Sequence, residues 1–506
     1  MIATIFIYFL ILIAIALYSQ RRNSAALDYF LGGRKLGVIP LAMTTAATYV
    51  SASSFIGGPG MAYKYGLSWV FLATVQYPVG LLMMGILGNQ LQSLGQKHGL
   101  YDLPDYIGLR YGSRLYQKFC AGIIAIVLLL SLIVAIMGGS RLLQGALAAW
   151  QLNYPNALLI FSLTLATYTL LGGFRAVVLT DILQGIWMLL ASLILLFFLW
   201  HRAGGANGLE QFSQTHAALF RPDSGGKLPL HYTINFTILV GFGMIAHPVS
   251  FSRLLALEKG KSLRNSIFIS IAVIGLLTFL PHLIGFLGRI VLPGIAEPDQ
   301  LMGRISQLFQ APQYGWAGKV FSGMLISAML AAIMSSADSA LNTLGLTIYR
   351  HLLPRSLSSP KKNHATVPSE ASPSKSALTG IASPTNQDAE NRHFQLSRLL
   401  AGGGILLAAI FALKPPQLLV ALNLYALGST QVTLLWPVVL GMYTRRPDAR
   451  SACSSSLAGL AAYGLLNRLF PSFGGAALLP YCLLISGISY WVTAVYTTRF
   501  SPRRPI

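Results

Sequence analysis

Charged residues are scarce in this chain. Aspartate, glutamate, lysine and arginine make up 10% of the 506 residues, whereas hydrophobic residues make up 54%. Soluble globular domains carry about 25% charged residues, so this composition argues against a soluble fold. The mean hydropathy is +0.62, and apolar stretches of about 17–25 residues recur from end to end, each long enough to cross a bilayer. The sequence therefore predicts an all-α polytopic membrane protein in contact with lipid.

Cysteine and acidic residues are also few. The three cysteines, Cys120, Cys453 and Cys482, have neither the spacing of a disulfide framework nor that of a zinc site. The predicted spans contain no nucleophile–base pair or His/Glu metal motif, so we expect neither an enzyme nor an organic cofactor. Fourteen acidic residues against 36 basic ones give a formal charge of +22. Because the basic residues lie between apolar segments, we interpret them as topology determinants and expect no nucleic-acid partner.

The apolar segments predict about 13 transmembrane helices. They lie near residues 2–18, 38–62, 66–90, 119–149, 155–174, 177–200, 232–252, 266–291, 317–348, 397–413, 417–443, 453–468 and 474–498. With the N-terminus outside, inward loops hold about 26 lysines and arginines and outward loops about 9, which is a strong positive-inside bias. We therefore predict that the N-terminus lies outside and the C-terminus inside.

One segment differs in composition from the rest. Residues 350–396 are rich in serine and proline and almost free of aromatic residues, so they cannot bury enough apolar surface to fold. We predict a disordered cytoplasmic loop, either a plain linker or a phosphorylated regulatory segment. It separates residues 1–349, with predicted helices one to nine, from residues 397–500, with helices ten to thirteen.

The second predicted span makes a poor continuous helix. It contains the run Thr44-Thr-Ala-Ala-Thr-Tyr-Val-Ser-Ala-Ser-Ser-Phe-Ile-Gly-Gly-Pro-Gly60, and glycine and proline weaken helices. A break near Ala47–Ser51 would free main-chain carbonyls to bind a cation and would turn a helix dipole toward a ligand. Broken backbone is tolerated at membrane depth only where protein or a water-filled cavity surrounds it. The alternative is close helix packing through small residues.

The ninth predicted span presents hydroxyl groups on one face. Ala332, Ser335, Ser336 and Ser339 are spaced i, i+3, i+4 and i+7, which places them on the same side of a helix. Hydroxyls and a carbonyl from this face, with carbonyls from the broken span, would form a shell of neutral oxygens. Such a shell suits Na⁺, a hard cation of single charge.

Two acidic residues of the fourteen, Asp181 and Asp338, fall inside long apolar segments. An ionised carboxylate at membrane depth is costly and usually lines an ion or substrate path. Asp181 is either an ion-exit carboxylate or the partner of Arg175 in a structural salt bridge. Asp338 either adds charge to a cation path or caps polar neighbours such as Ser335 and Asn342. Proton coupling through either carboxylate is a lesser variant.

Several motifs resemble those of the sodium:solute symporter family. They are Asp28-Tyr-Phe-Leu-Gly-Gly-Arg34, Gly172-Gly-Phe-Arg-Ala-Val-x-x-Thr-Asp-x-x-Gln184 and Ala331-Ala-Ile-Met-Ser-Ser336. The resemblance extends over nearly the whole chain. Within the family, three stretches are most similar to members that carry pantothenate, namely Ala47 to Leu67, Gly138-Gly-Ser-Arg-Leu-Leu143 and Lys414-Pro-Pro416.

The resemblance implies a fold and a sodium site. The fold is a five-plus-five inverted repeat over residues of about 38–200 and 232–443, with broken helices holding the ligands midway across the membrane. Transferred position by position, the sodium site falls on the carbonyls of Ala47, Val50 and Ala332 and on the hydroxyls of Ser335 and Ser336. Ser51 matches a further position of this site, and Asp181 matches the acidic residue on the inward sodium route.

The resemblance also implies a small carboxylate-bearing substrate, most closely pantothenate, imported with Na⁺ across a bacterial inner membrane. Ser53, Ser54 and Gln76 face the cavity if the second span is broken, and His247 falls at a polar substrate position of sugar-carrying relatives. Arg141 either pairs with the substrate carboxylate or reaches the outer surface. His247 has packing as its alternative role. Other symported solutes (proline, a monocarboxylate or a sugar) and a solute sensor that does not transport remain alternatives.

Overall fold

The computed structural model describes residues 1–22, 26–51, 53–147, 150–353, 384–413, 419–444, 447–470 and 474–500. Every regular element in these ranges is a helix, and an isolated bridge between Leu36 and Leu257 accompanies them. The all-helical architecture predicted from the composition is therefore present in the described part of the chain.

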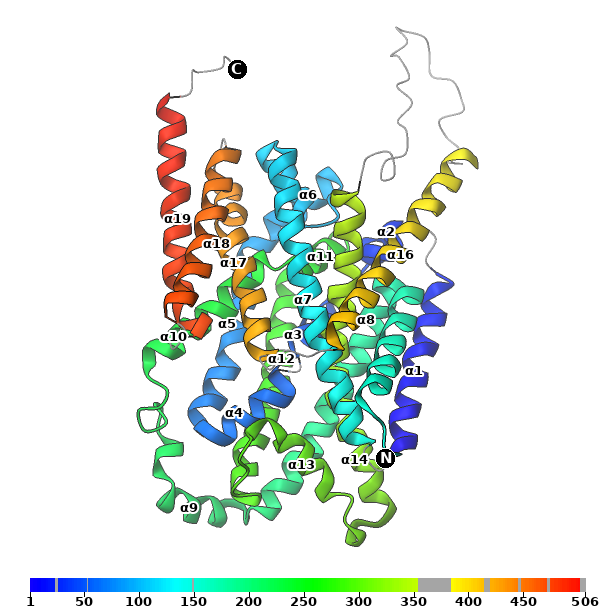
Figure 1. Ribbon diagram of the computed structural model, residues 1–506, viewed down its shortest axis with the longest axis vertical. Helices are drawn as coiled ribbons and strands as arrows, with labels where there is room; N and C mark the ends of the chain where they lie inside the picture. The colour runs from blue at the N-terminus through cyan, green and yellow to red at the C-terminus, as the bar shows by residue number, and fades with distance from the viewer. Residues whose placement is uncertain are drawn as a thin grey trace.

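Ten long helices form the body of the protein (Figure 1). They are α1 (Ile2–Gln20), α5 (Leu67–His98), α7 (Arg114–Ala146), α8 (Tyr154–Arg202), α12 (Leu263–Val291), α14 (Gly315–Thr347), α16 (Pro384–Ala412), α17 (Leu419–Tyr443), α18 (Ala449–Leu469) and α19 (Gly474–Phe500). Among the described residues, eight helices are long and apolar enough to cross a membrane, or nine if one bent pair counts as a span.

Short elements connect or interrupt these helices. They are α2 (Ala26–Leu31), η1 (Gly32–Arg34), α3 (Val38–Tyr49), η2 (Ser53–Gly57), α4 (Gly58–Tyr65), α6 (Leu103–Tyr111), α9 (Gly205–Thr215), η4 (Ala217–Phe220), α10 (Leu230–Gly241), η5 (Phe242–Ala246), α11 (Pro248–Ala256), η6 (Pro298–Gln300), α13 (Leu301–Leu308), η7 (Pro312–Tyr314) and η8 (Ile348–Leu352). Most of the loop predicted at 350–396 lies outside the described residues, which leave out 354–383; at its two edges the structure has η8, which extends to Leu352, and α16, which begins at Pro384.

Two segments cross the body as broken helices. In the first, α3 ends at Tyr49, and Val50 has the non-helical angles φ −83° and ψ 88° before the chain resumes in η2 and α4. The break expected near residues 47–51 is therefore present. In the second, α10 and η5 are followed by α11 at an angle of 48°, with Pro248 at the first turn of α11. Proline suits a first helical turn because the amide it lacks has no partner there.

The helix α8 bends sharply at Gly173, which has φ 61° and ψ −161°. This bend separates the two spans predicted at 155–174 and 177–200. A side chain here would be strained by the positive φ, and its Cβ would lie 2.4 Å from the ring of Tyr29. The Tyr29 hydroxyl in turn donates to the carbonyl of Leu170 at 3.2 Å. The bend therefore needs glycine, both for the backbone angle and for the close approach of α2.

The start of α1 and the end of α19 lie toward opposite ends of the long axis (Figure 1). The helices α2 and α6 lie toward the same end of the molecule as the last turns of α19. The helices α9 and α13 lie at the other end, where α1 begins. The helix α14 is the most enclosed of the apolar helices, since 78% of the residues in its apolar stretch are buried, against 33% for α1. Most residues in the apolar stretch of α14 are therefore shielded from lipid.

Candidate functional site

The break in α3 lies directly against α14. The Ser335 hydroxyl donates to the carbonyl of Ala47 at 3.0 Å and lies 3.2 Å from the carbonyl of Ala332, while the Ser336 hydroxyl donates to the carbonyl of Thr48 at 2.8 Å. The structure thus brings together four of the residues that the sequence assigned to the sodium site. A hydroxyl oxygen that donates its hydrogen keeps lone pairs for a cation, so this cluster is rich in neutral oxygen ligands.

Two further predicted ligands lie at the break itself. Val50 is fully buried and follows the last residue of α3, and its amide donates to the carbonyl of Ala47 at 3.2 Å. Ser51 follows outside any regular element, and its carbonyl accepts from the amides of Ser54 and Phe55 at 3.0 Å. Both positions are therefore adjacent to the hydroxyl cluster.

Beside this cluster lies a buried charge network around Asp181. The guanidinium of Arg253, from α11, lies 3.3 Å from the Asp181 carboxylate and donates to the Ser339 hydroxyl at 2.7 Å and to the Thr48 hydroxyl. Thr44 also donates to Asp181. The network joins α3, α8, α11 and α14 at one point, so separating these helices requires breaking a buried ion pair.

The partner of Asp181 differs from the one the sequence suggested. We considered Arg175 for this salt bridge, but Arg175 is exposed, and Arg253 occupies the position instead. Arg253 is the largest fully buried side chain in the described residues. By sequence alone Arg253 belongs to the inward loop charges, because it directly follows the seventh predicted span, 232–252. The carboxylate oxygen Oδ1 of Asp181 and the Nε of Arg253 have no hydrogen-bond partner among the described residues.

Asp338 occupies a separate polar position on α14. Its carboxylate accepts from the Tyr168 hydroxyl at 3.1 Å and from the Ser339 hydroxyl at 3.2 Å, and it is fully buried. Asn342, which we expected beside it, instead donates to the carbonyl of Phe30 at 3.5 Å. The described hydrogen bonds of Asp338 are thus to Tyr168 and Ser339, and not to the Ser335 and Asn342 side chains that the sequence suggested.

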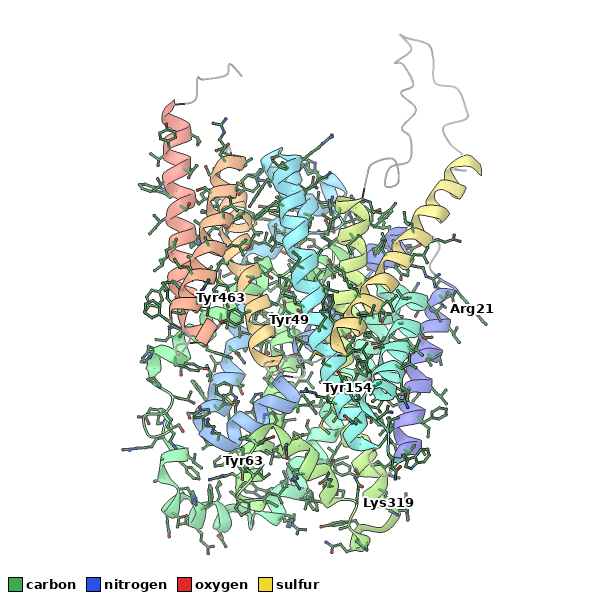
Figure 2. The ribbon with its side chains drawn as sticks, viewed as in Figure 1. Arg21, Tyr49, Tyr63, Tyr154, Lys319 and Tyr463 are labelled. Atoms are coloured by element: carbon green, nitrogen blue, oxygen red, sulfur yellow. The ribbon has the colours of Figure 1, made fainter. Side chains whose placement is uncertain are left out.

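The predicted substrate residues surround the two breaks. Ser54 bonds to the Tyr77 hydroxyl at 2.9 Å, and neighbouring Gln76 is buried with its carbonyl oxygen unpartnered among the described residues. His247 ends η5, its ring centroid lies 6.2 Å from that of Tyr49, and its Nδ1 also has no described partner. Figure 2 shows Tyr49 near the middle of the long axis. Polar groups from both broken segments thus converge near the centre of the molecule.

Two other predicted substrate residues lie elsewhere or are only partly described. Arg141 is exposed on α7, in accord with the surface role that we considered for it. Ser53 begins η2, and its side chain lies outside the described residues.

Sequence reasoning missed three polar residues of this central region. Tyr49 bonds to Ser250 of α11, and Tyr77 faces the same region from α5. Gln431 of α17 donates to the carbonyl of Leu239, and its own carbonyl oxygen is unpartnered among the described residues. A signal for Gln431 existed, because it is a side-chain amide within a largely apolar predicted span.

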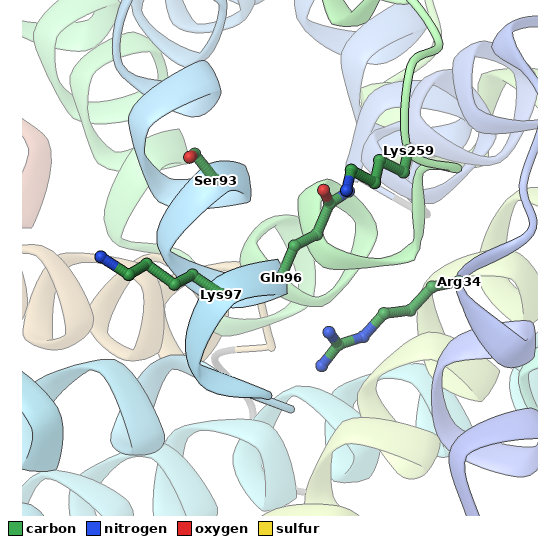
Figure 3. A pocket seen from close by; sticks show the side chains of 5 residues that line it. All are labelled: Arg34, Ser93, Gln96, Lys97 and Lys259. Atoms are coloured by element: carbon green, nitrogen blue, oxygen red, sulfur yellow. The ribbon is translucent and has the colours of Figure 1, made fainter.

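A cavity of about 430 Å³ lies beside the C-terminal part of α5 (Figure 3). It is lined by Arg34, Ser93, Gln96, Lys97 and Lys259. Arg34 donates to the carbonyls of Gly95 and Leu100 at the C-terminal end of α5. Cations are favourable at this end of a helix dipole, so the charge of Arg34 stabilises the end of α5.

Comparison with known proteins places the chain in a family. The model of the sodium:solute symporter family matches residues 29–363. The sodium/pantothenate symporter of Escherichia coli (strain K12) is 34% identical over 492 residues, covering 96% of this chain and 94% of the relative. The sodium/pantothenate symporter of Haemophilus influenzae is 33% identical over 469 residues, covering 92% of this chain and 89% of the relative.

The fold also matches a solved transporter structure. This is the substrate-bound outward-open state of a Na⁺-coupled sialic acid symporter, with a TM-score of 0.77, 17% identity, and coverage of 100% of this chain and 98% of that one. These relatives are membrane transporters and not enzymes. From its motifs, its broken helices and these matches, the chain belongs to the sodium:solute symporter family.

Proposed function

We propose that this protein imports pantothenate, a small carboxylate-bearing solute, together with Na⁺ across a bacterial inner membrane. Two relatives that match nearly the full chain are sodium/pantothenate symporters of bacteria. The observation that carries the sodium part of the proposal is the cluster in which the hydroxyls of Ser335 and Ser336 meet the last carbonyls of α3.

The proposed topology has 13 spans, with the N-terminus outside and the C-terminus inside. An odd number of spans puts the two ends of the helical body on opposite sides, and in Figure 1 the start of α1 and the end of α19 lie toward opposite ends. Counting α3 to α4 and α10 to α11 as one span each, and α8 as two, gives the predicted number. Two broken spans, each opening a run of five, support the proposed five-plus-five inverted repeat.

Three consecutive residues of α3 contact the sodium cluster, the Arg253 network and the proposed substrate site. The carbonyl of Ala47 faces Ser335, the hydroxyl of Thr48 accepts from Arg253, and the ring of Tyr49 lies beside His247. A change in the position of this turn therefore acts on all three contacts at once. We infer that Na⁺ binding, by fixing the turn, favours substrate binding, and reciprocity requires the converse.

The Arg253 network provides the inward barrier in this mechanism. Ser339 is one helical turn beyond Ser335 toward the inner end of α14, so its bond to Arg253 lies between the sodium cluster and the proposed cytoplasmic face. Movement of α11 away from α8 and α14 would break the pair with Asp181 and the bond to Ser339, and would open a route inward. Asp181 would then be exposed to receive the departing cation, in line with its proposed role on the sodium path.

The test is uptake of radiolabelled pantothenate into proteoliposomes containing the purified protein. An inward Na⁺ gradient should stimulate uptake, and choline substituted for Na⁺ at fixed pH should abolish the stimulation. Proline and lactate are the competitors. Stronger inhibition by either than by unlabelled pantothenate would reassign the substrate, and sodium-dependent binding without accumulation would identify a sensor.

A further inference from the structure

A cluster of four ionisable side chains joins α6 to the end of α14, well apart from the sodium site. Asp102 and Asp105 come from the start of α6, and Arg350 and His351 come from η8, which directly continues α14. The Nε2 of His351 lies 2.9 Å from both carboxylate oxygens of Asp102, and Arg350 donates to Asp105 at 2.9 Å. Asp102 and the His351 side chain are almost fully buried.

The charges of this cluster balance only when His351 carries a proton. Two carboxylates then face one guanidinium and one imidazolium. Burial lowers the pKa of the His351 imidazole, but the Asp102 carboxylate beside it outweighs that effect and raises the pKa above its ordinary value. Burial would likewise raise the pKa of Asp102, and the charge of His351 holds it below the usual range. The pair is therefore charged near neutral pH.

The remaining neighbours of His351 include the amide of Gln117, which accepts either protonation state, and the cation Arg350, whose charge opposes the His351 proton. From α7, the side-chain amide of Gln117 lies 3.3 Å from Nδ1 and can present its nitrogen or, turned over, its oxygen. Arg350 stacks on the Tyr101 ring at 4.3 Å. The described part of α16 contributes Arg398, whose charge acts on Tyr29. The carboxylates of Asp102 and Asp105 are thus the groups that respond to the His351 proton.

The helix α6 connects this cluster to other elements around the central site. The Tyr106 hydroxyl donates to the carbonyl of Val438 at 2.9 Å, and Arg110 donates to the carbonyl of Gly441 at 2.7 Å, both in α17. The ring of Tyr106 also lies 5.9 Å from that of Phe251 in α11, the helix that carries Arg253. A change at the junction of α6 and η8 therefore reaches the helices that form the inward barrier.

We propose that His351 and Asp102 form a proton-dependent latch, which fastens the inner end of α14 to α6 and is released when the cytoplasmic pH rises. The cytoplasmic placement rests on the topology given under the proposed function. Loss of the His351 proton leaves Asp102 buried without a counter-charge and removes the bond that spans the two elements. Buried carboxylates without a partner are costly, so the released state becomes favoured.

The direction of the pH effect follows from the raised pKa of His351. The pair of His351 with Asp102 contributes its full stabilisation below the pKa of an unpaired histidine, about 6.5. This stabilisation is lost as the pH rises through the pKa that His351 has in the latched state. One proton changes the opening equilibrium by at most about tenfold per pH unit within that window. Below the window, the latch should be insensitive to pH.

Hydrogen–deuterium exchange of the full-length protein in lipid nanodiscs tests this latch without any substrate, so it can succeed or fail independently of the pantothenate assignment. After correction for the intrinsic rate, peptides covering residues 99–111 and 348–353 should lose up to about tenfold protection per pH unit above pH 6.5. His351→Gln should remove this dependence. Asp102→Asn should remove it as well, because the carboxylate charge that the His351 proton balances is gone. Asparagine still caps α6, so the helix itself is preserved.

His98→Gln is the matched control, since His98 is an exposed histidine in the last turn of α5 at the same end of the molecule. It should retain the wild-type pH dependence. Unchanged pH dependence in His351→Gln, or its absence in the wild type, would overturn the proposal. A change in protection caused by a chelator at constant pH would also overturn it, because the ligand would then be a metal held by Asp102, Asp105 and His351 and not a proton.

Discussion

Removing one hydroxyl of the sodium cluster should weaken sodium binding without disturbing the fold. In Ser335→Ala, the carbonyl of Ala47 keeps its partner, the amide of Val50 at 3.2 Å, so no buried acceptor is left unpaired. Ser335 is fully buried and near two carbonyls, whereas Ser336 is partly exposed and bonds to one. We therefore expect the larger effect from Ser335.

The magnitude follows from the charge of the ligand. A polar contact to a charged group contributes about 1.5–3 kcal/mol, which corresponds to a rise of roughly 10- to 150-fold in the half-saturating Na⁺ concentration. Ser335→Ala should lie toward the upper part of this range and Ser336→Ala toward the lower part. The double variant should show almost no stimulation by Na⁺ at accessible concentrations.

Two assays separate binding from transport. Uptake into proteoliposomes at varied external Na⁺ gives the half-saturating concentration, and thermal unfolding at varied Na⁺ reports binding without substrate, since a bound ligand stabilises the folded state. Thr347→Val is the control, because Thr347 is buried on the same helix and its hydroxyl has no partner among the described residues. Wild-type sodium dependence in Ser335→Ala would refute the assignment of the site.

Three further substitutions probe the structure. Arg253→Gln leaves Asp181 buried without a counter-charge, which should lower the free energy of unfolding by about 3–5 kcal/mol. Adding Asp181→Asn should recover part of this loss, as measured by thermal unfolding. No recovery would mean that the pair is not energetically coupled. Gly173→Ala should destabilise the protein by roughly 1–3 kcal/mol, because position 173 has a positive φ and a close contact. Gly122→Ala, in open space on α7, should not destabilise it. Equal melting temperatures for the two variants would contradict this account. Arg141→Ala should leave the KM for pantothenate within about twofold because the side chain is exposed, and abolished uptake would restore Arg141 as a carboxylate partner.

Local composition predicted the broken span well. The hydroxyl and glycine residues after Thr44 are incompatible with a continuous helix, and the structure ends α3 at Tyr49. The i, i+3, i+4 spacing on α14 likewise placed Ser335 and Ser336 on the face that meets this break. Both features depend on short-range backbone preferences and helix periodicity, which can be read directly from a sequence.

Long-range pairing was harder to predict. Arg253 follows an apolar run and, by position, looks like an ordinary loop charge, yet its guanidinium reaches Asp181, 72 positions away in the chain. Nothing local distinguishes it from its exposed counterpart Arg175. The pairing depends on how α11 packs against α8 and α14, and hydrophobic periodicity does not specify that arrangement.

The enclosure of α14 by other helices has a consequence for the surrounding bilayer. In its apolar stretch, 78% of the residues of α14 are buried, against 33% for α1. The helix α14 therefore has little surface on which acyl chains can act. A change in hydrocarbon thickness is accommodated by tilting of helices that touch lipid, so peripheral helices such as α1 should absorb it. Lipids of different chain length should then alter how fast the transporter cycles while leaving its affinity for Na⁺ nearly constant.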